Sequence, residues 1–189
     1  RNNLAFAYQE MGEVERAVRL LEVVLAQRVR ILGDTHPGTL NSRHNLASAY
    51  QASGAADRAV HLFEVVLAQS EQVLGDTHPR TLTSQHSLAA AYQEVGEVER
   101  AVRLLEVVVA QSEQVHGDTH PSTLTSRNNL AAAYRDVGEN ERAVRLLEVV
   151  VAQSEQALGD THPSTLTSRN NLAAAYRDVG ENERAVRLL

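Results

Sequence analysis

The sequence predicts an all-α protein, a right-handed α-solenoid of antiparallel helix hairpins. The first observation is a repeat of 42 residues, of which the 189-residue chain contains four and a half. The second is that each unit carries two apolar stripes at the three- and four-residue spacing of buried helix faces. Periods of about 20 to 50 residues are typical of solenoids, whose core is shared between neighbouring units. The tyrosines and prolines mark the period (Tyr8, Tyr50, Tyr92, Tyr134 and Tyr176; Pro37, Pro79, Pro121 and Pro163).

The period divides the chain, read as a single solenoid over residues 1–189, into repeats and helices. The repeats are 1–42, 43–84, 85–126, 127–168 and the half repeat 169–189. The predicted helices are 1–11, 13–32, 37–53, 55–74, 79–95, 97–116, 121–137, 139–158, 163–179 and 181–189. Each full unit therefore contributes two helices, and neither could bury its apolar face alone.

The first helix of a unit is predicted to begin at proline and to end at glycine. Pro121 suits the first turn, where a missing N–H costs nothing. Leu130 and Tyr134 belong to the apolar stripe that follows. Gly138 should end the helix, because a left-handed C-terminal cap is accessible to glycine without strain.

The second helix follows from Glu139, whose charge suits the positive end of the helix dipole. Its stripe includes Ala143, Leu147 and Val150, and it closes at Gly159. The β-branched run at residues 149–151 does not indicate a strand, because it lies within a helical pattern too long for one.

Composition excludes several classes of protein. The chain has no cysteine, so disulfide frameworks and thiolate chemistry are absent. A formal net charge of −6 argues against general nucleic-acid binding, which needs basic surface. No apolar run reaches the roughly 18 residues of a membrane span, and no signal peptide is recognisable. We therefore expect a cytoplasmic protein that has no nucleic-acid or membrane partner.

No catalytic constellation is recognisable, so we expect neither an enzyme nor a cofactor. The triplet Asp118-Thr119-His120 recurs in four units at equal spacing, which indicates a turn that caps the following helix rather than a reaction centre. His116 and His120 are four residues apart, but Gly117 lies between them and no third ligand is near in sequence. We interpret His116 as a surface substitution and expect no metal site.

The residues Asn129, Leu130, Ala131, Tyr134, Gly138, Ala143 and Leu147 carry a family resemblance. This pattern resembles the tetratricopeptide repeat, whose usual period is about 34 residues. With Leu-Gly-Asp-Thr-His-Pro between units, the longer repeat is similar to that of kinesin light chains and of related bacterial arrays, some of which follow a signal-transduction NTPase module. The resemblance implies a non-catalytic scaffold that binds a protein or an extended peptide in a concave groove lined by the first helices.

Equivalent positions along the first helices define the candidate groove. An asparagine ladder can hydrogen-bond a peptide backbone, since an amide both donates and accepts. The resemblance implies this role for asparagines of the first helix, although histidine or serine (Ser87) replaces them in some units. Guanidinium groups pair well with carboxylates, and the aspartates that follow them would partly neutralise them. The predicted groove residues are Asn45, Asn128, Asn129, Asn170, Asn171, His44, His86, Gln51, Gln93, Arg135 and Arg177.

Two alternatives to a peptide groove stay open. The polar face could be a solvated surface whose pattern reflects duplication, because residues 127–147 and 169–189 are identical at all 21 positions. That identity fits recent duplication or a consensus-like design. The array could also be structural, associating through open solenoid ends, or serve as the sensor arm of an NTPase. Since the chain starts and stops inside a hairpin, we expect a fragment of a larger adaptor or signalling protein.

Overall fold

The computed structural model describes residues 2–188, apart from the side chains at positions 2, 3, 6 and 9. All regular structure within this range is α-helical. The helices are α1 (Asn2–Glu10), α2 (Val14–Leu32), α3 (Pro37–Ala52), α4 (Ala56–Leu74), α5 (Pro79–Glu94), α6 (Val98–His116), α7 (Pro121–Asp136), α8 (Asn140–Leu158), α9 (Pro163–Asp178) and α10 (Asn182–Leu188). Where the ends differ from the predicted ones, they do so by one residue, because the cap residues themselves are not helical. Positions 1 and 189 of the predicted terminal helices lie outside the described residues.

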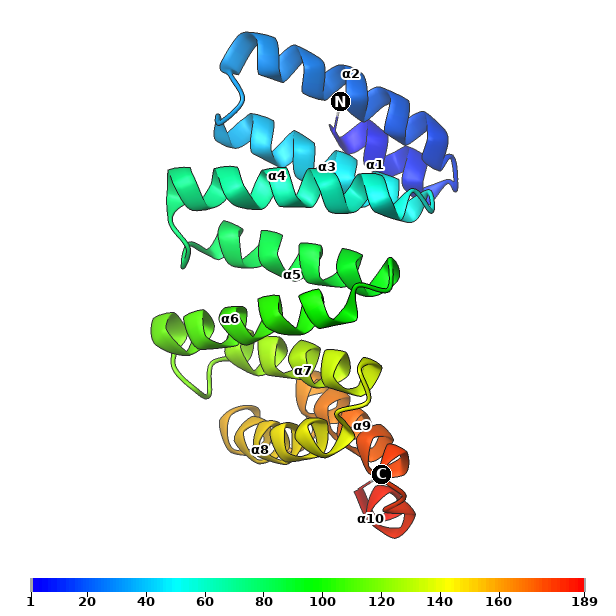
Figure 1. Ribbon diagram of the computed structural model, residues 1–189, viewed down its shortest axis with the longest axis vertical. Coiled ribbons are helices and arrows are strands. Elements are labelled where there is room, and N and C mark those ends of the chain that lie inside the picture. Colours follow the sequence, from blue (N-terminus) through cyan, green and yellow to red (C-terminus); the bar gives the residue numbers. More distant parts are fainter. Residues whose placement is uncertain (1, 189) are drawn as a thin grey trace. The chain divides into compact units, whose positions relative to one another are not determined.

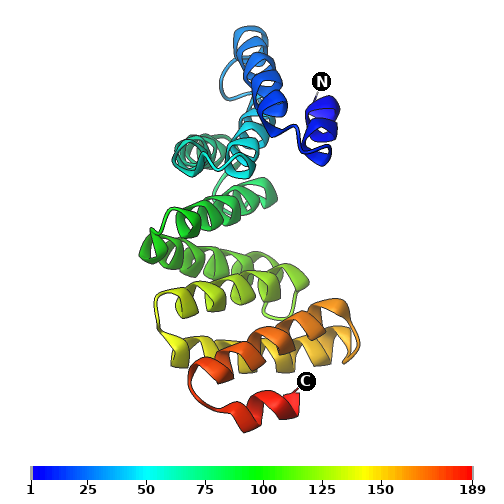
Figure 2. The ribbon, with the colours of Figure 1, turned by 90° about the vertical axis from the view of Figure 1, so that its right-hand side faces the viewer.

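Contacts divide the chain into two compact units, Arg1–Gly96 and Glu97–Leu189. In the first unit, each helix from α1 to α5 packs on the next, as the successive layers of Figure 1 show. In the second, α6 to α10 pack in the same consecutive way, and α7 also contacts α9. Figure 2 shows this second unit from its side. The all-α helical-repeat class is confirmed, whereas a single array over residues 1–189 stays a prediction.

Small residues form much of the core between these helices. Ala47, Ala59, Ala131 and Ala143 have exposed fractions of 0%. Such residues let neighbouring helices approach closely, and larger side chains such as Leu147 fill the space between them. In both units, the residues that recur at helical spacing in the sequence are therefore the ones buried between helices.

The two kinds of interhelical turn are built by glycine. After α7, the Gly138 N–H donates to the Arg135 carbonyl at 3.0 Å and the Glu139 N–H donates to the Tyr134 carbonyl at 2.8 Å. These two bonds form a Schellman cap, with Gly138 at φ +81°. After α6, Gly117 adopts φ 84° and ψ 169°, a conformation essentially restricted to glycine. The sequence prediction that glycine ends each helix has this physical cause.

Histidine caps the first helix that follows each Asp-Thr-His turn. The Nδ1 atom of His120 accepts a hydrogen bond from the Ser122 N–H at 3.1 Å, and His36, His78 and His162 do the same for their own helices. The expected cap is present, but its acceptor is an imidazole rather than a short side chain. In three of the four turns the aspartate pairs with an arginine of the first helix that follows.

We expect His120→Ala to lower the free energy of unfolding by about 1 kcal/mol, since an N-terminal N–H of α7 would lose its acceptor. His120→Asn should restore most of that loss, because an asparagine oxygen can accept the same bond. Urea denaturation followed by circular dichroism measures both. Equal stability of the alanine and asparagine variants would show that the imidazole acts by some other contact.

Candidate functional site

The predicted groove residues lie on the first helices of the hairpins, α3 and α5 in one unit and α7 and α9 in the other. Several of them bond between neighbouring first helices, and three of these bonds join residues 43 positions apart, one more than the period. The structure therefore brings together residues that are not in equivalent positions. Each unit is described separately below.

In the second unit, Asn128 joins α7 to α9. Its Nδ2 donates to the Ser168 hydroxyl at 2.9 Å and to the Leu124 carbonyl at 3.0 Å, and its Oδ1 accepts from Asn171 Nδ2 at 3.1 Å. Asn129 and Asn170 are exposed. Within the asparagine ladder, Asn128 therefore links α7 to α9, whereas the side chains of Asn129 and Asn170 reach solvent.

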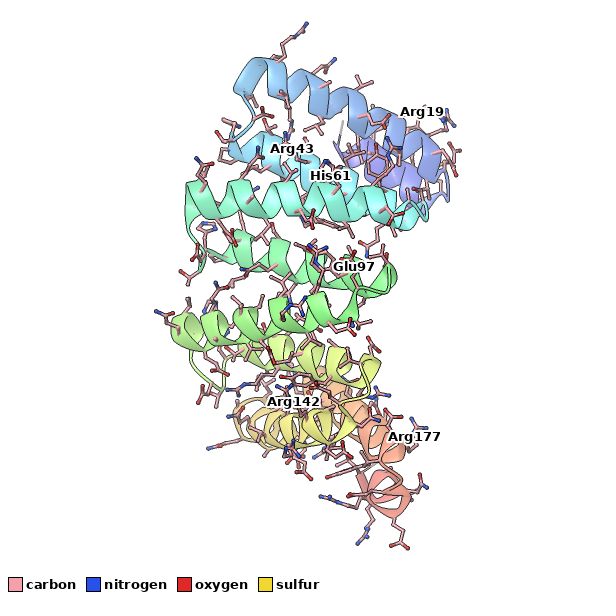
Figure 3. The ribbon with its side chains drawn as sticks, viewed as in Figure 1. Arg19, Arg43, His61, Glu97, Arg142 and Arg177 are labelled. Carbon is pink, nitrogen blue, oxygen red and sulfur yellow. The ribbon has the colours of Figure 1, made fainter. Side chains whose placement is uncertain are left out.

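The charged and amide residues near the ends of the first helices are also paired. In the first unit, Gln51 Nε2 donates to Glu94 Oε1 at 2.6 Å. In the second, Arg135 Nε donates to Asp178 Oδ2 at 2.6 Å. The sequence suggested that an aspartate would neutralise the arginine that it follows. The bond of Arg135 is instead to Asp178, on the next first helix. Arg177 is exposed on α9 (Figure 3), and Asn45 and Gln93 are half-buried.

His44 and His86 are half-buried on α3 and α5. The His44 ring lies edge-on against Phe63, with the ring centres 5.3 Å apart. Burial, and secondarily the positive charge of Arg80, lower the pKa of His44, and burial alone lowers the pKa of His86. Both imidazoles are therefore uncharged near pH 7 and act there as hydrogen-bonding groups rather than cations.

A cavity of about 150 Å³ lies between α3 and α5, with residues of α4 also in its wall. It is lined by Leu40, Asn41, His44, Val66, Ser70, Arg80, Thr83 and Ser84. The Arg80 guanidinium donates to the Pro37 carbonyl at 3.2 Å and to Asn41 Oδ1 at 3.4 Å. The equivalent positions in other units hold Gly38, Ser122 and Ser164, so this cation is specific to one repeat. The sequence analysis missed Arg80 because it looked for residue types shared by equivalent positions of the repeats, and arginine occurs at this position in only one repeat.

A cluster of tyrosine, glutamate and arginine recurs between hairpins and was also missed. Tyr134 donates to Glu106 Oε1 at 2.8 Å, across 28 residues of sequence. The Arg142 guanidinium lies 4.1 Å from the centre of the Tyr134 ring and donates to Glu106 at 2.9 Å. The same arrangement surrounds Tyr176. The cluster therefore connects one hairpin to the next.

The second missed cluster surrounds an arginine one residue before the asparagine ladder. Arg127 is 8% exposed and pairs with Glu113 at 2.7 Å and with Asp118 at 3.3 Å. The Asp118 side chain belongs to the Asp-Thr-His turn, so the turn is tied to the following helix. The signal was present in the sequence as a repeated arginine and a repeated aspartate nine residues apart.

The structure also places the histidine pair considered as a metal ligand. The rings of His116 and His120 are stacked, with centres 4.5 Å apart and planes 19° apart. Within the part of the chain that the structure describes, no group of three or more histidine, aspartate or glutamate residues is arranged to hold a metal ion. Over the same residues, no helix combines the length and apolar character of a membrane span.

Comparison with known proteins identifies the family of this chain. Two tetratricopeptide repeat family models match, one over residues 1–71 and the other over 81–122, 123–164 and 165–189. A comparison with curated proteins gives no significant match.

The similar solved structures cover almost the entire chain. One, described as nearly identical tetratricopeptide-like repeats of a putative kinesin light chain from Podosopora anserina, is 45% identical, with a TM-score of 0.90 over 99% of this chain and 89% of that one. A variant of those same repeats is 44% identical, with a TM-score of 0.92 over 99% and 88%. BtubC (BKLC) from P. vanneervenii, 22% identical with a TM-score of 0.84 over 98% and 74%, shares the fold. The chain belongs to the tetratricopeptide repeat family, with kinesin-light-chain-like repeats that form a protein-interaction scaffold.

Proposed function

We propose that this chain binds an extended peptide segment of a partner protein along the exposed faces of its first helices, in the cytoplasm and without catalysis of its own. The observation that carries the proposal is the cavity between α3 and α5, which is open to a side chain and offers both donors and acceptors. Small pockets with a few convergent polar groups are typical of binding sites.

The contacts suggest a division of roles among the predicted groove residues. Asn128 is engaged between α7 and α9, so its part in binding would be to hold neighbouring amides in place. Asn129 and Asn170 are exposed and suit direct contact with a peptide backbone. Arg80, at the cavity, suits a carboxylate of the peptide, because guanidinium–carboxylate pairs are strong and directional.

The test uses peptides selected from a displayed random library against the unaltered chain, with affinities measured by fluorescence anisotropy. Arg80→Ser places the residue of the sister repeats at the cavity, and Asn129→Ala with Asn170→Ala removes the exposed amides of the second unit. We expect one or other of these variants to weaken each selected peptide at least tenfold, equivalent to about 1.4 kcal/mol.

A matched control is Arg145→Ala, which removes an exposed cation from the second helix α8, outside the proposed binding face. Its affinities should stay unchanged. If all peptides bind the groove variants as well as the unaltered chain, the groove proposal is wrong. A molar mass that then rises with protein concentration in light scattering would favour the self-associating array.

A further inference from the structure

The junctions between a second helix and the next first helix contain a buried or half-buried guanidinium in three of the four cases that the structure describes. At the α6–α7 junction, Arg127 donates through Nε and NH2 to Glu113 Oε1 at 3.1 and 2.7 Å, and through NH1 to the Asp118 carbonyl at 3.2 Å. Its NH2 lies 3.3 Å from Asp118 Oδ1. Two carboxylates and a backbone carbonyl thus form a cradle of oxygen atoms around one cation.

The α8–α9 junction repeats this cradle, and the α2–α3 junction repeats its arginine and aspartate with Val29 in place of the glutamate. At α8–α9, Arg169 donates to Glu155 Oε1 at 2.6 Å and to the Asp160 carbonyl at 3.4 Å. At α2–α3, Arg43 donates to Asp34 Oδ1 at 2.7 Å. A guanidinium paired with the aspartate of the turn therefore occurs at three junctions, and a guanidinium paired with two carboxylates occurs at two of them.

The α4–α5 junction keeps the acids and lacks the cation. Glu71 and Asp76 stand where Glu113 and Asp118 stand, but Gln85 replaces the arginine. Two carboxylates consequently lie beside a neutral side chain, whereas each sister site with two carboxylates also has a guanidinium. A glutamine side chain is shorter than that of arginine and ends in one amide group, so it replaces only part of the donors of a guanidinium.

The side-chain amide of Gln85 also lacks one of its hydrogen-bond partners. The side chain is 1% exposed and hydrogen-bonds to Glu71, yet its Oε1 atom is buried with no hydrogen-bond partner. A buried polar atom without a partner typically costs about 1 to 3 kcal/mol. Burial, followed by the charge of Asp76, raises the pKa of Glu71, which is consistent with an acid that lacks its counterion.

We propose that the α4–α5 junction is a binding site for a guanidinium group supplied by another molecule, namely an arginine side chain of a protein partner. The incoming group would donate to Glu71, Asp76 and the free Oε1 of Gln85. Access is from solvent past Asp76, which is exposed, and Glu71, which is half-buried.

A guanidinium suits this site better than a metal ion. Its planar set of N–H donors can reach several oxygen atoms at once, as the sister arginines do. The junction has only two carboxylates, and Asp76, Glu71 and Gln85 belong to no group of three acidic or histidine ligands among the described residues. This site uses none of the predicted groove residues, so it extends the proposed function and does not depend on it.

The probe is N-acetyl-arginine amide, titrated into the full chain at low ionic strength and followed by NMR, with isothermal calorimetry for the stoichiometry. We expect saturable binding at one site, with the largest shifts in the side-chain amide resonances of Gln85. Gln85→Arg supplies the guanidinium from inside and should weaken binding at least tenfold while preserving the fold.

A second variant tests the cradle at a matched position. Arg127→Gln, with Glu113 and Asp118 retained, recreates the same environment at α6–α7 and should raise the stoichiometry from one site to two. Circular dichroism checks that this variant is folded. The uncharged N-acetyl-glutamine amide should not bind.

The proposal is overturned by any of three results: no saturable binding of the arginine probe, equal binding to Gln85→Arg, or binding of calcium chloride but not of the probe. None of these bears on the peptide groove, whose variants lie elsewhere. A partner peptide whose affinity falls with Gln85→Arg but not with Arg80→Ser would identify this junction as its arginine contact.

Discussion

Phe63→Ala should lower the free energy of unfolding by about 3 to 5 kcal/mol, the usual cost of removing a buried aromatic ring. Phe63 is 0% exposed and lies at the centre of α4, where it also contacts the His44 ring. Alanine would leave a void beneath one wall of the cavity between α3 and α5. Urea denaturation with two-state fitting measures the loss, and a weaker affinity for selected peptides should accompany it.

The sister repeats provide the control for this substitution. Leucine occupies the equivalent positions Leu21, Leu105 and Leu147, all of which are buried. Phe63→Leu should therefore cost clearly less than Phe63→Ala, because it removes fewer buried atoms and leaves the residue that the other repeats pack at this position. A leucine variant as unstable as the alanine variant would mean that the ring, through its contact with His44, has a role that the other repeats do not share.

Stability should fall steeply above about pH 10 because of the tyrosines between hairpins. Burial, followed by the hydrogen bond to glutamate, raises the pKa of Tyr134 and of Tyr176 to about 12, against an ordinary value of 10.0. The folded state therefore keeps these protons at a pH where the unfolded chain has lost them. Their contribution is fully present below pH 10 and is lost as the pH rises from about 10 to about 12.

The measurement is the free energy of unfolding in urea at several alkaline pH values, with tyrosinate absorbance to follow ionisation. Tyr134→Phe with Tyr176→Phe should be less stable at neutral pH and should lose less stability between pH 10 and 12. Parallel curves for the variant and the unaltered chain would show that other groups cause the alkaline loss.

The sequence predicted the helices closely because their signals are local. Pro121 fixes the start of α7, Gly138 permits the cap at its end, and the spacing of Leu130 and Tyr134 identifies the face between them. These signals act within a few residues and repeat in every unit. The same locality explains why the role of the histidine cap was predicted although its acceptor atom was not.

The polar contacts of the candidate site could not be predicted in the same way. Arg135 pairs with Asp178, which is 43 residues away, and Tyr134 with Glu106, which is 28 residues away. Such partners depend on how far one helix slides along the next, which the period does not specify. The unpartnered Oε1 of Gln85 is a further case, because the sequence shows the exchange of arginine for glutamine but not the burial of that oxygen.

The offset of 43 residues between bonded side chains, set against a period of 42, has a consequence for how such an array evolves. The repeats that begin at residues 127 and 169 carry one half of such a bond at one position and the complementary half at the next position, as Arg135 and Asp136 do. A duplicated segment of one period therefore brings both halves with it, and its copy fits the parent without any compensating mutation. An array of such repeats can therefore lengthen by copying, and its repeats then differ at single positions such as Arg80 and Gln85.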